Sequence, residues 1–350
     1  MRIAQLHLEA GTPSRGVLAK SDVLRDSWTA AGAVVREFRP TITAGSRLSV
    51  LVAIDRAARA LAPRMRSFDP DVVYARQSIW TPSVAALFAS HRVVVEVNGA
   101  LSRQLRRRSG LAAFYERRTA PWLWRRTAGV VGVTRELVDA HRRRGMPSCV
   151  VGSPVEVPEA MPERNPVRPR RVIMLLGEGE DRPVPPSRGL DRLRVLARAL
   201  PDVDFVVLGG RAPSFAGDPA NLDFRPRLEG PRLRELLATS TASVAGLAPH
   251  RSGLGESRTL KIRASLAAGL PVIHAQNDPD LPESGSFLLR LESRDSTDDG
   301  DVRRVGAFLD SVVDDPDCWR EAWRHAREFF SVEVTEGRRL AFLERVAGRV

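Results

Sequence analysis

The 350-residue sequence is poor in several residue types, and each scarcity excludes a class of protein. Its two cysteines, Cys149 and Cys318, lie far apart and predict neither a disulfide framework nor a cysteine-based metal site. Its six histidines are scattered, so their spacing does not indicate metal ligation. No apolar run approaches the roughly 18 residues of a membrane-spanning helix. The opening residues, 1–11, are typical of a strand and loop rather than a signal peptide. We therefore expect a cytoplasmic protein with no bound metal or cofactor.

Lysine is also scarce. Of the 54 basic residues only Lys20 and Lys261 are lysine, a bias typical of a GC-rich genome. A compact ammonium and a planar guanidinium are not equivalent at a tight site. Two explanations of Lys261 therefore stay open: retention for its shape at such a site, or chance.

Positive charge is concentrated in the amino-terminal part of the chain. Residues 1–150 hold 25 basic and 11 acidic residues, whereas residues 151–350 hold 29 and 31. Much of the excess lies in 103–144, a pattern that favours peripheral contact with an anionic membrane at its inner face. A solvated helix with inward-packed aromatics explains the pattern equally well. No nucleic-acid motif accompanies the charge, so we expect no nucleic-acid partner. Four aromatic residues interleave with the arginines: Phe114, Tyr115, Trp122 and Trp124.

Strand-like and helix-like segments alternate along the chain, which predicts parallel sheets with helices on both faces. In the first half we expect strands at 3–8, 34–38, 72–74, 93–97 and 129–133, and helices at 17–31, 48–62, 111–126 and 135–144. In the second half we expect strands at 172–176, 204–208 and 243–248, helices at 190–199 and 231–238, and a largely helical tail from 302. Pro63 is expected to end the second helix, and Thr134 to cap the fourth. The expected organisation is an amino-terminal domain 1–155, a proline-rich linker 156–170, a carboxyl-terminal domain 171–325, and a carboxyl-terminal helix 326–350 that crosses back.

The most informative segment is residues 255–273, GESRTLKIRASLAAGLPVI. Apolar residues at 260, 262, 266 and 267 predict a helix with a buried face, and Gly269 stands where a helix C-cap is expected. A helix N-terminus entered through a glycine-containing loop favours phosphate, because its backbone N–H groups and dipole attract anions. An ordinary strand–helix unit with a glycine cap is the alternative interpretation.

This segment resembles the carboxyl-domain motif of family-four glycosyltransferases. The resemblance implies an α/β fold of the GT-B type, in which two Rossmann-like domains face a ligand-binding cleft and carboxyl-terminal helices close back on the amino-terminal domain. The positions that follow the family pattern are Glu256, Ser257, Leu260, Lys261, Ala267, Gly269, Pro271 and Val272.

The resemblance also implies a donor site for a nucleotide sugar. Arg188 and Gly189 resemble the family's Lys-Gly pair, whose cation binds the donor pyrophosphate. The family's preceding Gly-Arg is replaced by Gly177-Glu178, and Arg182 is a candidate substitute. Segment 222–227 resembles the one that lines the base. The residues that we expect to bind the donor are Gly16, Arg188, Gly189, Gly209, Arg225, Arg227, Ser257, Arg258, Thr259, Leu260 and Lys261.

Three residues are candidates for contact with the reacting groups. Glu256 matches the first carboxylate of the family's E-x7-E pair. The resemblance assigns this first carboxylate to the hydroxyls of the donor sugar and the second to the hydroxyls of the donor ribose. The second carboxylate, expected two helical turns further on, is replaced by Ala264, with Ser265 as a neighbouring polar group. Glu96 and Asn98 lie at the end of a buried strand, in the segment Glu96-Val97-Asn98-Gly99, where the resemblance implies that many relatives carry a histidine on the catalytic face. For these two residues a purely structural role at the strand end stays open.

The sequence therefore predicts a retaining, metal-independent hexosyltransferase that uses a nucleotide diphosphate sugar. Its acceptor could be anionic, lipid-linked or a natural product. No dedicated base is expected, since the resemblance implies that the departing phosphate assists deprotonation of the acceptor. The alternatives are a non-catalytic GT-B scaffold or partner protein, indicated by Ala264 and Glu178, and a nucleotide-sugar epimerase.

Overall fold

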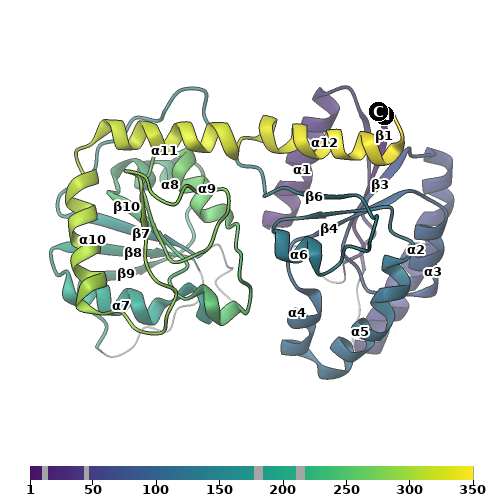
Figure 1. The fold of residues 1–350 in the computed structure, drawn as a ribbon, viewed down its shortest axis with the longest axis horizontal. Coiled ribbons are helices and arrows are strands. Elements are labelled where there is room, and N and C mark those ends of the chain that lie inside the picture. Colours follow the sequence, from purple (N-terminus) through teal and green to yellow (C-terminus); the bar gives the residue numbers. More distant parts are fainter. Residues whose placement is uncertain (10–14, 43–46, 177–183, 210–216, 350) are drawn as a thin grey trace. The chain divides into compact units, whose positions relative to one another are not determined.

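The computed structural model describes residues 1–9, 15–42, 47–176, 184–209 and 217–349. The chain forms two compact units, Met1–Pro154 together with Val332–Val350, and Val155–Ser331. Each unit contains a six-stranded parallel sheet flanked by helices (Figure 1). None of the described helices is both long enough and apolar enough to cross a bilayer.

The sheet of the first unit has the strand order β2-β1-β3-β4-β5-β6. Its centre is made of apolar strands buried on both faces, such as β4, as expected when helices cover both sides of a parallel sheet. The short strand β6 was missed in the sequence. The bounds are β1 (Arg2–Leu6), β2 (Val34–Phe38), β3 (Val72–Arg76), β4 (Val93–Val97), β5 (Gly129–Gly132) and β6 (Ser148–Val150).

Two helices from opposite ends of the chain cover one face of this sheet. Trp28 of α1 (Arg15–Ala30) and Phe342 of α12 (Val332–Ala347) pack in one core with Ile3 and Val94. The connections from β2 to β6 run along the sheet in the direction opposite to the β1–β2 connection. Because crossovers between parallel strands are right-handed, the helices in these connections cover the other face of the sheet (Figure 1). They are α2 (Arg47–Phe68), α3 (Pro82–Ala89), α4 (Leu101–Arg108), α5 (Gly110–Trp124) and α6 (Arg135–Asp139).

Two helix predictions in this unit need correction, and one helix was missed. α2 continues through Pro63 to Phe68, because the buried residues Met65 and Phe68 extend its apolar face beyond the proline. The helix expected at 111–126 is α5, whose N-cap Ser109 accepts a hydrogen bond from Ala112 N at 3.3 Å, whereas the preceding helix α4 was not predicted. α6 is capped by Thr134, as predicted, but ends at Asp139 rather than at residue 144.

The sheet of the second unit has the strand order β12-β11-β10-β7-β8-β9. The chain builds β7, β8 and β9 in one direction and then returns to add β10 on the other side of β7. The neighbouring strands β7 and β10 therefore form the topological switch point. The bounds are β7 (Arg170–Leu175), β8 (Val203–Leu208), β9 (Leu222–Arg225), β10 (Ala242–Ala245), β11 (Val272–His274) and β12 (Leu288–Arg290).

Helices cover both faces of this second sheet. α7 (Leu190–Ala199) and α10 (Asp299–Val312) share a core with alternate residues of β7 and β8. α8 (Gly230–Thr239), α9 (Leu260–Ala267) and α11 (Pro316–Phe329) pack on the opposite face. Two short 3-10 helices, η1 (Pro186–Arg188) and η2 (Pro249–Ser252), lie in the connections that follow β7 and β10.

The proline-rich segment expected as a linker lies within the second unit. Asn165 N donates to Ala238 O and Val167 N donates to Thr239 O, both at 3.0 Å. The buried Arg164 donates to Ser240 O at 2.6 Å and stacks over the Trp319 ring. At the other boundary α11 stays with the second unit, and only Val332 onwards belongs to the first.

Candidate functional site

The switch point of the second unit brings η1 and the start of α7 against the loop that follows β10. Leu247 N donates to Arg188 O at 3.1 Å, and Ala248 N donates to Ser187 O at 3.3 Å. Gly189, between η1 and α7, has a φ of 70°. Arg251 of η2 closes the arrangement with two hydrogen bonds to the Asp191 carboxylate, at 2.9 and 2.7 Å. Two of the predicted donor residues, Arg188 and Gly189, are therefore built into the switch point.

Two helices begin at this edge of the sheet, and in neither does the side chain of the N-cap residue form a capping hydrogen bond. α7 follows β7 and its N-cap is Gly189, which has no side chain. α9 follows β10 and its N-cap is Thr259, whose hydroxyl donates instead to Gln276 Oε1 at 3.2 Å. Backbone N–H groups of a first helical turn attract anions when no side chain satisfies them. Arg188 directly precedes one of these N-termini, and Lys261 lies in the first turn of the other.

The segment that leads into α9 differs from the prediction in where the helix begins. α9 starts at Leu260, so Glu256 and Ala264 are not two turns apart on one helix. Leu260 is 45% exposed, whereas Ile262, Leu266 and Ala267 are buried as predicted. The positive φ of 67° at Gly269 fits its predicted place at the helix end.

Within this segment Ser257 and Arg258 are both fixed by neighbours. Ser257 N donates to Asn277 O at 2.9 Å, which joins the segment to the loop after β11. Arg258 forms two hydrogen bonds to the Asp280 carboxylate, at 2.7 and 2.9 Å, and its side chain is only 8% exposed. The buried Arg263 pairs with Asp280 as well. Arg258, a predicted donor residue, is thus part of an internal ion-pair cluster.

The remaining donor candidates of this unit lie at the ends of β8 and β9. Gly209 N donates to Arg225 O at 3.0 Å, so the two residues are adjacent. The Arg225 side chain pairs with Asp223 at 2.6 Å, and that of Arg227 pairs with Glu229 at 3.0 Å. The predicted phosphate-binding positions Gly177, Glu178 and Arg182 lie outside the described residues.

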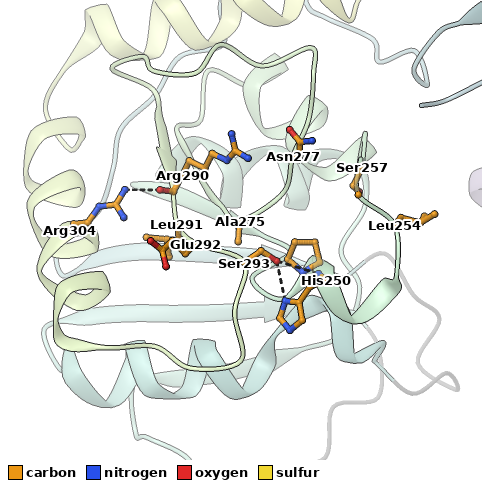
Figure 2. A pocket seen from close by; sticks show the side chains of 12 residues that line it. His250, Leu254, Ser257, Ala275, Asn277, Arg290, Leu291, Glu292, Ser293 and Arg304 are labelled. Carbon is orange, nitrogen blue, oxygen red and sulfur yellow. Dashed lines mark hydrogen bonds between the residues drawn. The ribbon is translucent and has the colours of Figure 1, made fainter. Parts of the chain in front are cut away.

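A cavity of about 640 Å³ opens at the carboxyl ends of β11 and β12 (Figure 2). His250 Nδ1 and Ser293 Oγ are 3.0 Å apart on one side, and Arg304 donates to Arg290 O at 2.6 Å on another. Of the predicted donor residues only Ser257 lines this cavity. The cavity therefore lies beside the switch point, on the β11 and β12 side of the 255–259 segment. Most of its other residues come from the segments around β11 and β12 and from α10, where the sequence carries no recognised motif.

In the first unit, three of the residues singled out in the sequence form a compact polar cluster at the end of β4. Lys20 Nζ donates to Glu96 Oε1 at 2.6 Å and to Asn98 Oδ1 at 3.1 Å. Asn98 Nδ2 donates to Glu96 Oε2 at 2.9 Å. Gly16 lies in the first turn of α1, with no atom within 4 Å of the position that a Cβ would occupy.

A second buried ion pair on α12 extends this cluster. Arg339 pairs with Glu336 and donates to Gly152 O at 3.0 Å. Glu336 also accepts a hydrogen bond from Trp28 Nε1 at 3.1 Å. Burial alone would raise the pKa of Glu96, but the positive charges of Lys20 and Arg339 outweigh it and hold that pKa well below its usual value. Glu96 is therefore an ion-paired carboxylate rather than a group poised to accept a proton.

Two buried histidines lie at the carboxyl ends of strands. Burial lowers the pKa of His7 to about 4, and nearby Arg39 adds to the effect. Burial likewise lowers the pKa of His274 to about 4, with Arg290 as the next cause. Both rings are therefore neutral at physiological pH. Among the described residues no group of three or more His, Cys, Asp or Glu side chains is arranged to hold a metal ion.

Comparison with known proteins identifies the fold but no closer relationship. No family model matches the sequence, and no curated protein matches it. HepE from Anabaena, solved in complex with UDP-glucose, is similar with a TM-score of 0.62 and 13% identity over 100% of this chain and 99% of that chain. A glycosyltransferase from Rickettsia africae ESF-5 gives a TM-score of 0.66 and 13% identity over 100% and 99%. A match in the GtfA/B complex has a TM-score of 0.56 and 13% identity; it covers 83% of this chain but only 61% of that chain.

These likenesses, together with the two parallel six-stranded sheets, confirm the predicted α/β fold of the GT-B type. The return of α12 to the first unit agrees with that architecture. At such low identity the comparisons establish the fold alone, and the chemistry has to be argued from the site.

Proposed function

We propose that this protein is a retaining, metal-independent glycosyltransferase of the family-four type that transfers a hexose-like sugar from a nucleoside diphosphate donor. The observation that carries the proposal is the pair of helix N-termini, of α7 and α9, which begin beside the switch point and whose N-cap residues form no side-chain capping hydrogen bond. Ligands of open α/β sheets bind at the carboxyl ends of the strands at such a point. The UDP-glucose bound by HepE, a protein of similar fold, supports a nucleotide-sugar donor.

The chemical task of the site would be to stabilise a diphosphate leaving group. The N–H groups at the start of α7 and α9, with Arg188 and Lys261, would supply positive potential where negative charge develops. In this proposal Glu256, four residues before α9, contacts the donor sugar. The acceptor proton would leave with the help of the departing phosphate. The ion-paired state of Glu96 fits a reaction without a carboxylate base in the first unit.

The acceptor would contact the first unit near the Lys20–Glu96–Asn98 cluster. Lys20 holds both Glu96 and Asn98, so the cluster presents a fixed polar surface at the end of β4. The excess of basic residues in this unit favours an acceptor that is anionic or carried on an anionic surface.

One observation favours a second candidate function, a GT-B scaffold without transfer activity. Ala264 stands where the family pattern has its second carboxylate, and Arg258 is engaged by Asp280. Such a protein would keep the fold while lacking contacts to the donor ribose.

Two measurements separate these functions. Calorimetric titration with UDP, GDP and ADP should reveal saturable binding of at least one diphosphate, whereas a scaffold should bind none. With the matching nucleotide sugar, Glu256→Ala should lower turnover by about a hundredfold or more, since losing a transition-state contact commonly costs ~2–4 kcal/mol. Glu235→Ala, an exposed carboxylate on α8, is the matched control. Turnover of Glu256→Ala within about threefold of wild type would remove Glu256 from the mechanism.

A further inference from the structure

The helix α5 of the first unit carries an unusual set of exposed apolar side chains. Leu111 is 74% exposed, Phe114 52% and Trp122 47%, and all three belong to this one helix. At about 100° per residue these side chains fall within about 80° of one another on the helix surface. The opposite side of α5 is the one that packs on the unit, through residues such as Ala113 and Leu123. The apolar stripe therefore faces solvent.

Arginines surround this stripe. Arg118 and Arg125 fall within the same arc, and the Arg118 guanidinium lies over the Phe114 ring, 5.9 Å from its centroid. The exposed Arg117 and Arg126 project on the two flanks of the stripe. We call the side chains of Leu111, Phe114, Arg117, Arg118, Trp122, Arg125 and Arg126 the α5 face.

No exposed carboxylate between residues 103 and 135 offsets this positive charge. Glu116 is the only acidic residue between Arg103 and Arg135, and it points inward with 6% exposure. Burial raises the pKa of this carboxyl. The unit as a whole holds 29 basic and 14 acidic residues, whereas the second unit holds 25 and 28. An anionic partner is therefore attracted to this unit and meets exposed apolar groups at α5.

Trp122 is held in position rather than loosely attached. Its ring meets Trp80 edge to face with centroids 5.3 Å apart. Arg126 Nη1 donates to Trp122 O at 2.8 Å. A preorganised indole beside arginines suits the boundary between headgroups and acyl chains, where an amphipathic ring has one apolar and one hydrated side.

We propose that the α5 face is a docking surface for an anionic lipid bilayer, with Leu111, Phe114 and Trp122 inserted among the headgroups and the arginines paired with lipid phosphates. A nucleic acid would satisfy the arginines but would leave Leu111, the most exposed of the apolar residues, without a counterpart. The inference does not depend on the proposed transferase activity, because vesicle binding is measured without donor or acceptor.

The test is sedimentation of the full chain with large unilamellar vesicles. Wild-type protein should bind vesicles that contain phosphatidylglycerol and phosphatidylcholine at low salt, and should bind pure phosphatidylcholine vesicles at least tenfold more weakly. Raising the salt to about 0.5 M should reduce binding, because screening shortens the range of the attraction. The double substitution Arg118→Gln/Arg125→Gln should weaken binding about fivefold per arginine, which corresponds to about 1 kcal/mol each.

A pair of matched apolar variants tests the insertion itself. Leu111→Ser/Phe114→Ser should weaken vesicle binding severalfold, whereas Val34→Ser/Val52→Ser, at residues 55% and 50% exposed in the same unit, should leave it unchanged. Circular dichroism should confirm that both variants stay folded. Equal effects of the two pairs, or no vesicle binding by wild type at low salt, would overturn the proposal. Binding to duplex DNA that depends on the arginines, without vesicle binding, would identify a nucleic-acid surface instead.

Discussion

Gly189 lies directly against Leu247, across the switch point of the second unit. A Cβ on Gly189 would come within 2.8 Å of the Leu247 Cβ and 3.0 Å of the Ala248 N. The φ of 70° adds a backbone penalty for any other residue. The close contact between η1 and the loop after β10 thus requires a residue without a side chain.

We therefore predict that Gly189→Ala destabilises the protein and separates the two helix N-termini from their shared site. The free energy of unfolding should fall by more than the roughly 1 kcal/mol expected from the positive φ alone, and UDP binding should weaken at least tenfold. Gly230→Ala is the matched control, since its φ is 59° but no atom lies within 4 Å of the added Cβ. Similar losses in both variants would show that backbone strain, not the contact with Leu247, is responsible.

The two basic residues near the helix N-termini should act on the diphosphate and not on the base. Arg188→Met or Lys261→Met should weaken binding of the nucleoside diphosphate by about 10- to 100-fold, since a charged hydrogen bond contributes about 1.5–3 kcal/mol, and should leave the bare nucleoside unaffected. Isothermal titration with both ligands measures the difference. Arg232→Met, an exposed arginine on α8, serves as the control. A parallel loss for both ligands would point to an effect on folding.

The buried pair of Lys20 and Glu96 should be strongly coupled. Their side chains are 15% and 4% exposed, so Lys20→Met leaves a buried carboxylate without its closest cation. We expect a loss of about 3–5 kcal/mol in unfolding free energy, as is usual for a broken buried pair. The double variant Lys20→Met/Glu96→Gln should lose less than the sum of the single losses. Urea denaturation of all four proteins measures the coupling, and additive losses would contradict it.

His274 should make the protein less stable as the pH falls from about 6.5 toward 4. Its pKa is lowered to about 4 in the folded state, mainly by burial, so below 6.5 the unfolded chain binds a proton that the folded chain does not. By pH 5 this difference amounts to about 2 kcal/mol. His274→Gln removes the titrating group, so its stability relative to wild type should improve between pH 7.5 and pH 5. Parallel pH profiles of the two proteins would refute this origin.

The fold could be predicted from the sequence because its buried strands are short apolar runs that alternate with helices. β2, β4 and α7 have the predicted bounds, since turn residues border each of them. β6 and β12 were missed, because each has only three residues and so is too short to show an alternation of apolar and polar residues. The continuation of α2 through Pro63 was also missed. Helix propensity is a local property of the sequence, whereas the burial of Phe68 depends on the folded core.

The site was predictable only in part, for a different reason. A motif identified the 255–273 segment, but the start of α9 depends on contacts of Ser257 and Thr259 with the loop after β11. Lys20 and Glu96 are far apart in the chain, and a single sequence contains no signal that two such distant residues form an ion pair. The cavity beside the switch point is assembled from several elements that are far apart in the sequence, among them η2, β12 and α10.

The position of α12 in the first unit has a consequence for how the chain folds during its synthesis. Phe342 and Leu343 of this helix complete the core around Trp28, yet they are synthesised only after the whole of the second unit. Residues 155–331 form a continuous stretch, so the second unit is free to fold as soon as it has been synthesised. The first unit begins earlier but waits until α12 has been synthesised, and until then the apolar surface that α12 covers is exposed to the cell's chaperones and proteases. A truncation that removes α12 should therefore damage the unit whose strands are synthesised before the second unit.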